Sequence, residues 1–277
     1  MTIPNVYRFV GRFMELPRDH VNAYVVELSD SVVVVDTTLA LSSARALRKK
    51  AESSGKPIEA VLLTHGHPDH YTGMVAFEDV PRFASQGCLE FAHREDVVKS
   101  PVAMSLLGDD YPDHRVFPDK IIESGTTLTF GGTDFTFHSL GPGESDADGM
   151  WTFETGGHTS AFIGDVATLN CHCFFRDGHA YDWLRTLNDL SGRFDDRALL
   201  YPGHGTSPVG TEVLDWQRGY IRAFLHAVDR LEGNPDPAGR PAQENVIAAM
   251  KEYLPTDATL FLLDYELEKT IPRYLPG

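Results

Sequence analysis

Long apolar segments are missing from this sequence. No hydrophobic run approaches the roughly 18 residues that a membrane-spanning helix requires. The segment from Met1 to Glu15 carries Arg8 and Arg12 and contains no apolar stretch of the kind found in signal peptides. These absences argue against a membrane protein and against export, so we expect a cytoplasmic location.

Basic residues are scarce as well. The chain has 24 lysines and arginines against 40 aspartates and glutamates, which gives a formal net charge of -16. Nucleic acids and anionic membranes attract proteins through clustered lysine and arginine side chains. The charge balance therefore argues against both of these partners and favours a small-molecule substrate.

Cysteine is rare, and sequence repeats are absent. The three cysteines are an odd number, and Cys171 and Cys173 stand only two positions apart, which does not fit a disulfide framework. We expect Cys88 in the core as a small apolar residue. The 277 residues, 42% of them hydrophobic, can bury a large core. We predict one catalytic domain over residues 1–232, then a linker and a C-terminal helical extension over residues 233–277.

A histidine-rich motif follows the apolar segment 60–63. It reads Thr64-His65-Gly66-His67-Pro68-Asp69-His70, with three imidazoles and one carboxylate within six residues. A strand that ends in a tight loop can direct His65 and His67 at one ion, while Asp69 and His70 reach a neighbouring position. A polar loop that merely happens to be rich in histidine is the alternative. The clustering behind a hydrophobic strand favours a metal site.

Two further motifs follow the histidine motif along the chain. Gly164-Asp165 ends an apolar segment, and Pro202-Gly203-His204-Gly205 follows later in the chain. With the histidine motif, they resemble the metallo-β-lactamase superfamily over about residues 5 to 230. The resemblance implies an α/β fold, a four-layer αββα sandwich, here with a C-terminal helical extension. It does not select a reaction, because lactonases, thioesterases, β-lactamases, phosphodiesterases, sulfatases and iron-dependent oxygenases share this fold.

The sequence departs from the superfamily at the third ligand of the first metal. Common members have Pro-Gly-His there, whereas this chain reads Gly-Pro-Gly-Glu-Ser-Asp over residues 141–146. Glu144 therefore stands in place of the usual histidine. Asp146 and Asp148 are alternative ligands at this position, and a histidine that superficially matches the missing motif occurs later, at His158.

Strand counting distinguishes Glu144 from His158. The third ligand and Asp165 must lie at the same end of a sheet, so the chain between them has to run out along one strand and back along the next. Glu144 precedes Asp165 by 21 residues, enough for two strands and a turn, whereas His158 precedes it by seven. We therefore predict that Glu144 is the ligand and that His158 lies on a hairpin at the opposite end of the sheet.

The resemblance implies two divalent metal ions. The predicted ligands are His65, His67 and Glu144 for one ion, Asp69, His70 and His204 for the other, and Asp165 as a bridge. Zinc is the first choice, while the hard oxygen donor of Glu144 leaves manganese and iron open. A metal-bound hydroxide would attack the substrate, and Asp69 would be the catalytic residue that orients it or carries its proton.

Other residues are expected around the metals. Asp36, at the end of the strand 31–36, either orients a metal ligand, as the resemblance implies, or caps its own turn. The stretch 94–120, broken by prolines, is expected as a long loop that forms a lid or a substrate wall. The predicted pocket residues are Tyr111, His172, Phe174 and Phe175.

The segment after Asp165 allows other interpretations. His172 and the two phenylalanines could face the core rather than the pocket. Cys171, His172, Cys173 and His179 could be taken for a separate zinc site, although four ligands within nine residues lack the usual spacing. Asp177 is expected to cap the following helix.

Three functions remain open. The first is a dinuclear metallohydrolase acting on a small ester, lactone or thioester. The second is an iron-dependent oxidoreductase of the persulfide-dioxygenase or diiron kind, and the third is a metal-binding protein without turnover. The apolar tail from Leu260 to Tyr274 packs either over the active-site mouth or against a second subunit in a homodimer.

Overall fold

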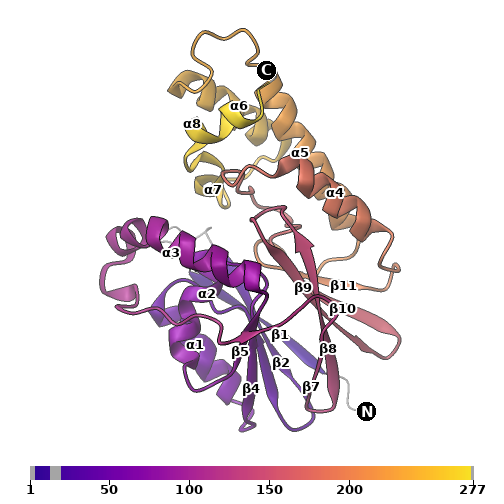
Figure 1. Ribbon diagram of the computed structural model, residues 1–277. Helices are drawn as coiled ribbons and strands as arrows, with labels where there is room; N and C mark the ends of the chain where they lie inside the picture. Colours follow the sequence, from indigo (N-terminus) through magenta and orange to yellow (C-terminus); the bar gives the residue numbers. More distant parts are fainter. Residues whose placement is uncertain (1–3, 13–19, 276–277) are drawn as a thin grey trace.

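Two β-sheets form the centre of the molecule (Figure 1). The computed structural model describes residues 4–12 and 20–275. One sheet has six strands, ordered β1 (Asn5–Arg12), β2 (His20–Glu27), β3 (Val32–Val35), β4 (Ile58–Leu62), β5 (Arg82–Ala84) and β6 (Lys120–Ile121). The other has five, ordered β11 (Leu199–Pro202), β10 (His158–Gly164), β9 (Asp148–Thr155), β8 (Thr133–Gly141) and β7 (Thr127–Phe130).

The β-branched strands of the first sheet are buried on both faces. Val26, Val33 and Leu62 point inward and pack against aromatic residues of the second sheet, such as Phe137 and Trp151. This cluster fills the space between the sheets. Successive side chains of a strand point to opposite faces. The apolar residues that alternate with these inward-pointing ones therefore lie on the outer face of the sheet, where other elements must bury them.

Helices cover the outer face of the first sheet. Val25 and Val34 pack there against Leu47 of α1 (Leu41–Glu52), Met74 of the short 3₁₀ helix η1 (Thr72–Phe77) and Ala92 of α3 (Gln86–Leu107). The short helix α2 (Pro68–Tyr71) lies between these elements in the chain. This arrangement forms one outer layer of the sandwich.

A second helical layer covers the other sheet. Met150, Ala161 and Leu200 of this sheet share a hydrophobic cluster with Trp183 of α4 (Ala180–Ser191) and Phe224 of α5 (Glu212–Asp229). The layers are thus helix, sheet, sheet and helix. The predicted α/β fold, a four-layer αββα sandwich with C-terminal helices, is confirmed.

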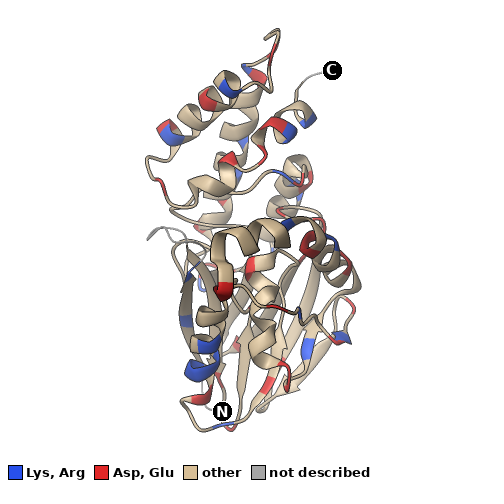
Figure 2. Cartoon of the chain, turned by 90° about the vertical axis from the view of Figure 1, so that its left-hand side faces the viewer, with Lys and Arg blue, Asp and Glu red and all other residues tan. Residues whose placement is uncertain are grey.

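The C-terminal helices extend this outer cluster. They are α6 (Arg240–Tyr253), α7 (Leu260–Asp264), α8 (Leu267–Thr270) and the 3₁₀ helix η3 (Ile271–Arg273). Met250, Leu263, Leu267 and Ile271 are buried in the cluster with α5. Figure 2 shows these helices above the sheets, with charged residues of both signs spread over them. Much of the apolar tail is therefore buried within its own chain, while the homodimer stays a prediction.

The stretch 94–120 differs from the expected loop. Helix α3 continues through Pro101 to Leu107, followed by the 3₁₀ helix η2 (Gly108–Asp110) and an irregular segment up to β6. Proline removes the hydrogen bond to the carbonyl four residues earlier, here that of Val97. The helix tolerates this loss because residue 97 is 77% exposed, so water is available there. Among the described helices, none is long and apolar enough to cross a bilayer.

Candidate metal centre

The histidine motif lies at the end of β4, where the chain turns into α2. His65, His67, Asp69 and His70 are all at least 94% buried. Gly66 lets this loop approach α3, because a Cβ atom there would lie 2.7 Å from the backbone oxygen of Cys88 and equally close to the nitrogen of residue 92. Pro68 begins α2 without losing a helical hydrogen bond. The loop is thus fixed between the first sheet and α3.

The second sheet supplies the other candidate ligands at one edge. Asp165 follows β10 and His204 follows β11, and these two strands run parallel, so their ends meet. Strand β9 is antiparallel to β10, so Glu144, which precedes β9, reaches the same edge. His158 begins β10 beside Thr155 and is exposed at the opposite end. These strand bounds agree with the count made from the sequence.

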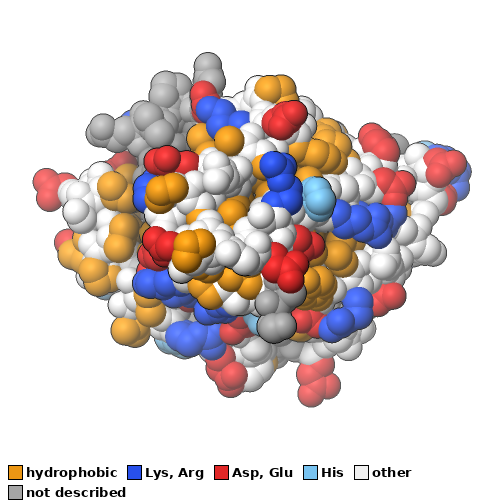
Figure 3. All heavy atoms as spheres, turned by 90° about the horizontal axis from the view of Figure 1, so that it is seen from above, with side chains coloured by type: hydrophobic (Ala, Val, Ile, Leu, Met, Phe, Trp, Pro, Cys, Tyr) orange, Lys and Arg blue, Asp and Glu red, His pale blue; other side chains and the backbone are white. Residues whose placement is uncertain are grey.

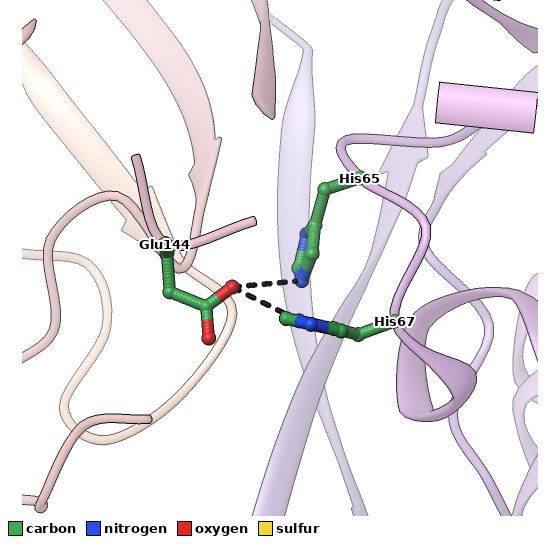
Figure 4. A group of neighbouring side chains, drawn as sticks. All are labelled: His65, His67 and Glu144. Atoms are coloured by element: carbon green, nitrogen blue, oxygen red, sulfur yellow. Dashed lines mark ion pairs between the residues drawn. The ribbon is translucent and has the colours of Figure 1, made fainter. Parts of the chain in front are cut away.

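Glu144 meets two histidines across the gap between the sheets (Figure 4). Its Oε2 atom lies 2.9 Å from Nδ1 of His67 and 3.6 Å from Nε2 of His65. These three side chains form one of the groups whose ligand atoms lie within 4.8 Å of one another. They match the first predicted metal position.

Asp165 lies between this group and a second one. Its Oδ2 atom is 3.8 Å from Nε2 of His65, 3.5 Å from Nε2 of His70 and 3.2 Å from Nε2 of His204. Asp69 completes the second group, with Oδ2 at 3.0 Å from Nε2 of His204 and at 3.5 Å from Nε2 of His70. The structure therefore brings the seven predicted ligands together, with Asp165 central.

Several of these buried atoms have no hydrogen-bond partner among the described residues. They are Nε2 of His65, Nε2 of His70, Oε2 of Glu144 and Oδ1 of Asp165. Buried polar atoms without a partner are costly, and nitrogen and carboxylate oxygen atoms together are the ligands that divalent transition metals take. The residue set fits bound divalent metal ions.

Asp36 supports two of the imidazoles from behind. Its Oδ2 atom lies 3.0 Å from Nδ1 of His70 and accepts a hydrogen bond from Oγ1 of Thr64 at 2.8 Å. The same hydroxyl lies 3.0 Å from Nδ1 of His65. Because carboxylates only accept, Nδ1 of His70 donates its proton to Asp36, which leaves Nε2 facing the centre as the nitrogen that could bind an ion. Such hydrogen bonds fix the orientation of metal ligands.

Asp177 plays a comparable part for His67, which the sequence interpretation missed. Its Oδ2 atom lies 2.8 Å from Nε2 of His67, so that nitrogen carries the proton and Nδ1 faces Glu144. The expected helix cap is wrong, because the N-cap of α4 is His179. The only signal in the sequence was that residue 177 lies in the segment after Asp165, which was expected to border the site.

Burial and ionic neighbours set the charges of the carboxyl groups. Burial alone would raise the pKa of Asp69, but the neighbouring His70 and His204 hold it below its usual value. The pKa of Asp165 is lowered by the same two histidines against the effect of burial. Burial raises the pKa of Glu144, although His67 opposes this shift. Without ions, His70 and His204 balance these carboxylates, because Asp69 and Asp165 raise the pKa values of both histidines against the effect of burial. Bound cations would take over this role.

The two alternative ligands are engaged elsewhere. Asp148 accepts hydrogen bonds from the backbone nitrogen of Glu144 at 2.7 Å and from Oγ of Ser145 at 2.6 Å, and so shapes the turn. Burial, with the nearby Glu144, raises the pKa of Asp148 to about 8. Asp146 is paired with Arg94 and lies 2.7 Å from His179. Neither belongs to a candidate metal group of the described residues.

A cavity of about 90 Å³ adjoins the candidate ligands. Metal-binding candidates line one side of it: His67, Asp69, Glu144, Asp165 and His204. Apolar residues dominate the other side: Leu39, Val102, Ala103, Leu106, Leu107, Phe174, Phe261, Leu262 and Tyr265. The wall therefore comes from α3, from the segment after Asp165 and from the C-terminal α7.

Of the four predicted pocket residues, only Phe174 lines this cavity. Tyr111 packs under α3 against Leu39 and Ala103. His172 is held by the hydroxyl of Tyr220 at 2.7 Å, and Phe175 stacks on Phe224 with ring centroids 3.8 Å apart. These three side chains lie away from the cavity because their packing partners in α3 and α5 hold them there.

The cysteine segment forms no metal group among the described residues. Cys171 and Cys173 are buried free thiols, and the Sγ atom of Cys173 lies 3.2 Å from Oγ1 of Thr168 and 3.2 Å from Nε2 of Gln217. Neither cysteine belongs to a described cluster of possible ligands. Burial raises the pKa of Cys173 beyond its usual range. This thiol therefore stays protonated in the core.

Comparison with known proteins places this site in context. The family model of the metallo-beta-lactamase superfamily matches residues 16–204. A metallo-beta-lactamase family protein from Thermus thermophilus is 23% identical, with a TM-score of 0.69 and coverage of 95% of this chain and 93% of that chain. A beta-lactamase domain protein from Burkholderia ambifaria is 15% identical, with a TM-score of 0.68 and coverage of 98% and 86%.

A metallo-beta-lactamase from Hirschia baltica is 21% identical, with a TM-score of 0.58 and coverage of 78% of this chain and 93% of that chain. At these identities the structural likeness concerns the fold. No curated protein matches the sequence significantly. The family match spans the histidine motif, Asp165 and His204, and the sandwich with its clustered ligands agrees with it. This chain belongs to the metallo-beta-lactamase superfamily.

Proposed function

We propose that this protein is a dinuclear metal-dependent hydrolase that acts on a small ester, lactone or thioester. The observation that carries the proposal is the pairing of two ligand groups around Asp165 with a cavity whose remaining wall is apolar except for Lys99. Most members of the superfamily are metallohydrolases, so the fold agrees with this reaction class. The apolar wall suits the hydrocarbon part of an acyl compound better than a polynucleotide, which carries one negative charge at each phosphodiester.

Divalent ions held by these ligands would supply Lewis acidity toward a carbonyl oxygen and toward a water molecule. In the overall reaction, the oxygen of water joins the acyl carbon and the bond to the alcohol or thiol breaks. The leaving group takes up a proton from that water. Asp69 lines the cavity, and His70 and His204 lower its pKa, so its ionised carboxylate can accept a hydrogen bond from a water molecule there and orient it.

An iron-dependent oxidoreductase of the persulfide-dioxygenase or diiron kind is the second candidate. The carboxylate of Glu144 favours it, because oxygen is a harder donor than the imidazole nitrogen usual at this position. The ligand geometry is compatible with both candidates. The identity of the bound metal, followed by the reaction observed, distinguishes them.

Metal content provides the first test. Elemental mass spectrometry on protein purified without added metal should find two equivalents of zinc or manganese. Glu144→Ala should lower this content because it removes a ligand of the first position, whereas His158→Ala should leave it unchanged because His158 lies at the far end of β10. Loss of metal in the His158 variant would contradict the ligand assignment.

Turnover provides the second test. The metal-loaded protein should cleave members of a panel of esters, lactones and thioesters. Asp69→Asn should lower kcat/KM by about 100-fold or more, because it removes the carboxylate that orients the attacking water and that belongs to the second ligand group. Iron as the dominant metal, with oxygen consumption on persulfide substrates, would favour the oxidoreductase instead. Absence of cleavage across the whole panel in metal-loaded protein would contradict the hydrolase proposal.

A further inference from the structure

Lys99 is the one lysine or arginine among the described residues that line the cavity beside the metal centre. It belongs to α3, and its side chain is only 16% exposed. Lysine usually extends its charged end into open water, and a charge held against apolar side chains is costly unless it has a partner. The ammonium group on this apolar wall therefore calls for an explanation.

Its contacts within the protein leave capacity for another partner. Nζ lies 2.5 Å from Oε2 of Glu95, one helical turn earlier, and 4.5 Å from the ring centroid of Phe174. Glu95 is shared, because its Oε1 atom also lies 3.5 Å from Nη1 of Arg176. An ammonium group carries three N–H donors, so one carboxylate does not use all of them. Lys99 and Phe174, over whose ring Nζ lies, both line the cavity.

A single ammonium group on an otherwise apolar wall suits a molecule that is apolar along its length and carries a negative charge at one end. Val102 and Leu106 follow it on α3, and they face the cavity although they are 40% and 49% exposed. The apolar wall thus continues from the cavity to the molecular surface. Figure 3 shows that the molecule, seen from above, exposes apolar side chains between charged groups of both signs.

We propose that Lys99 is a specificity-determining residue, which binds a carboxylate on the otherwise apolar substrate while its reactive carbonyl faces the metal ligands. The inference rests on the proposed hydrolase function and names the class of substrate as monoanionic acyl compounds. Lys99 makes no contact with the reacting atoms in this arrangement. It therefore improves binding of the ground state and the transition state alike, and its loss should raise KM more than it lowers kcat.

A matched pair of substrates tests this inference. The mono-para-nitrophenyl ester of adipic acid ends in a carboxylate, and para-nitrophenyl hexanoate carries a methyl group at the same place. The quantity measured is the ratio of kcat/KM for the charged ester to that for the neutral ester. Wild-type protein, loaded with its metal, should favour the charged ester.

Three variants give the controls. Lys99→Met keeps the apolar stem and should lower the ratio by about tenfold, the size expected for losing a charge-assisted hydrogen bond. Lys99→Arg keeps the charge and should retain most of the ratio. Lys49→Met removes an exposed lysine on α1, outside the cavity lining, and should leave the ratio unchanged. Metal content and thermal stability of each variant show whether it has folded.

The alternative is that Lys99 only neutralises the buried Glu95. In that case Lys99→Met would lower kcat/KM for both esters equally, or would leave their ratio unchanged, and either result overturns the inference. If wild-type protein cleaves neither ester, the hydrolase proposal fails for these substrates. Calorimetric titration with adipate and hexanoate then decides: a preference for adipate that disappears in Lys99→Met supports the carboxylate site, and equal binding overturns it.

Discussion

At the scale of single residues, the metal centre depends on side chains that touch no ion themselves. Asp36 holds His70 directly and reaches His65 through the hydroxyl of Thr64, and Asp177 holds His67. Each of these contacts fixes which ring nitrogen carries the proton, and so leaves the other nitrogen to face the centre. The candidate ligands His65, His67 and His70 are therefore oriented by the protein itself.

Removal of the Asp36 charge tests this orientation. Asp36→Asn keeps the size of the side chain but weakens the acceptor for Nδ1 of His70, so metal affinity should fall by about 10- to 100-fold. Competition with a chelator of known affinity measures the change. Asp30→Asn, in an exposed turn, is the control and should leave affinity unaltered. Wild-type affinity in Asp36→Asn would show that the carboxylate only caps its turn.

The second residue-scale prediction concerns Gly66. In Gly66→Ala the new methyl group would meet the backbone of α3 at 2.7 Å, so the loop must shift. We expect a loss of stability of about 1–3 kcal/mol, together with reduced metal content. Gly192→Ala, where nothing lies within 4 Å of the added Cβ, should change stability by less than about 0.5 kcal/mol. Denaturant unfolding of both variants gives the comparison, and equal stabilities would refute the steric argument.

At the scale of elements, the C-terminal segment holds the loop that borders the centre. The backbone nitrogen of His172 donates to the oxygen of Ala258 at 2.9 Å, and Nη1 of Arg273 donates to the oxygen of Asp177 at 2.9 Å. Helix α7 also supplies part of the cavity wall. The C-terminal extension thus contributes to the site as well as to the core, and we propose that it is an integral part of the catalytic unit.

Tyr274 provides the test of this connection. Its buried hydroxyl accepts a hydrogen bond from the backbone nitrogen of Ala180 at 3.0 Å, at the start of α4. Tyr274→Phe leaves that buried N–H without its acceptor and should cost about 1–3 kcal/mol in the free energy of unfolding. Tyr181→Phe, whose side chain is 54% exposed, should be nearly neutral. Equal unfolding free energies for the two variants would argue that the contact contributes nothing.

At the scale of the whole molecule, the metal centre lies where the two sheets meet at one edge. Ligands from the first sheet face ligands from the second, so bound ions would link the two halves of the sandwich. Without ions, the centre retains the buried carboxylates of Asp69 and Asp165 in their ionised form. The stability of the fold should therefore depend on metal binding.

Chelation tests this dependence. A metal ion that binds only the folded state stabilises it by about 2.7 kcal/mol when the free ion is at 100 times its Kd. Removal of the metal with a chelator should therefore lower the Tm of the protein measurably. Restored metal should restore the Tm. Glu144→Ala protein, which lacks one candidate ligand, should lose less stability on chelation than wild type. A Tm that is insensitive to chelator, in protein shown to have lost its metal, would contradict the linking role.

The sequence by itself determined the fold class and the local grouping of His65, His67, Asp69 and His70. These ligands share one loop, so their proximity is a matter of a few bonds and needs no tertiary information. The position of Glu144 relative to His158 also followed from the chain alone, because strand length limits how many times the chain can cross a sheet between two residues. The four-layer sandwich was predicted from the resemblance to the superfamily, which the histidine motif, Gly164-Asp165 and the Pro202-to-Gly205 motif carry in the chain itself.

Only the tertiary structure decided what surrounds that centre. Asp177 is 110 positions from His67, and the local pattern indicated a helix cap. Phe174 and Phe175 are neighbours of equal chemistry, yet one lines the cavity and the other stacks on Phe224. The reason is that Phe174 meets Tyr265 near the C-terminus, whereas Phe175 meets α5. Lys99 lines the cavity because this part of the stretch 94–120 belongs to helix α3 and not to the expected loop. Contacts between distant segments depend on packing across the whole fold, which local spacing does not encode.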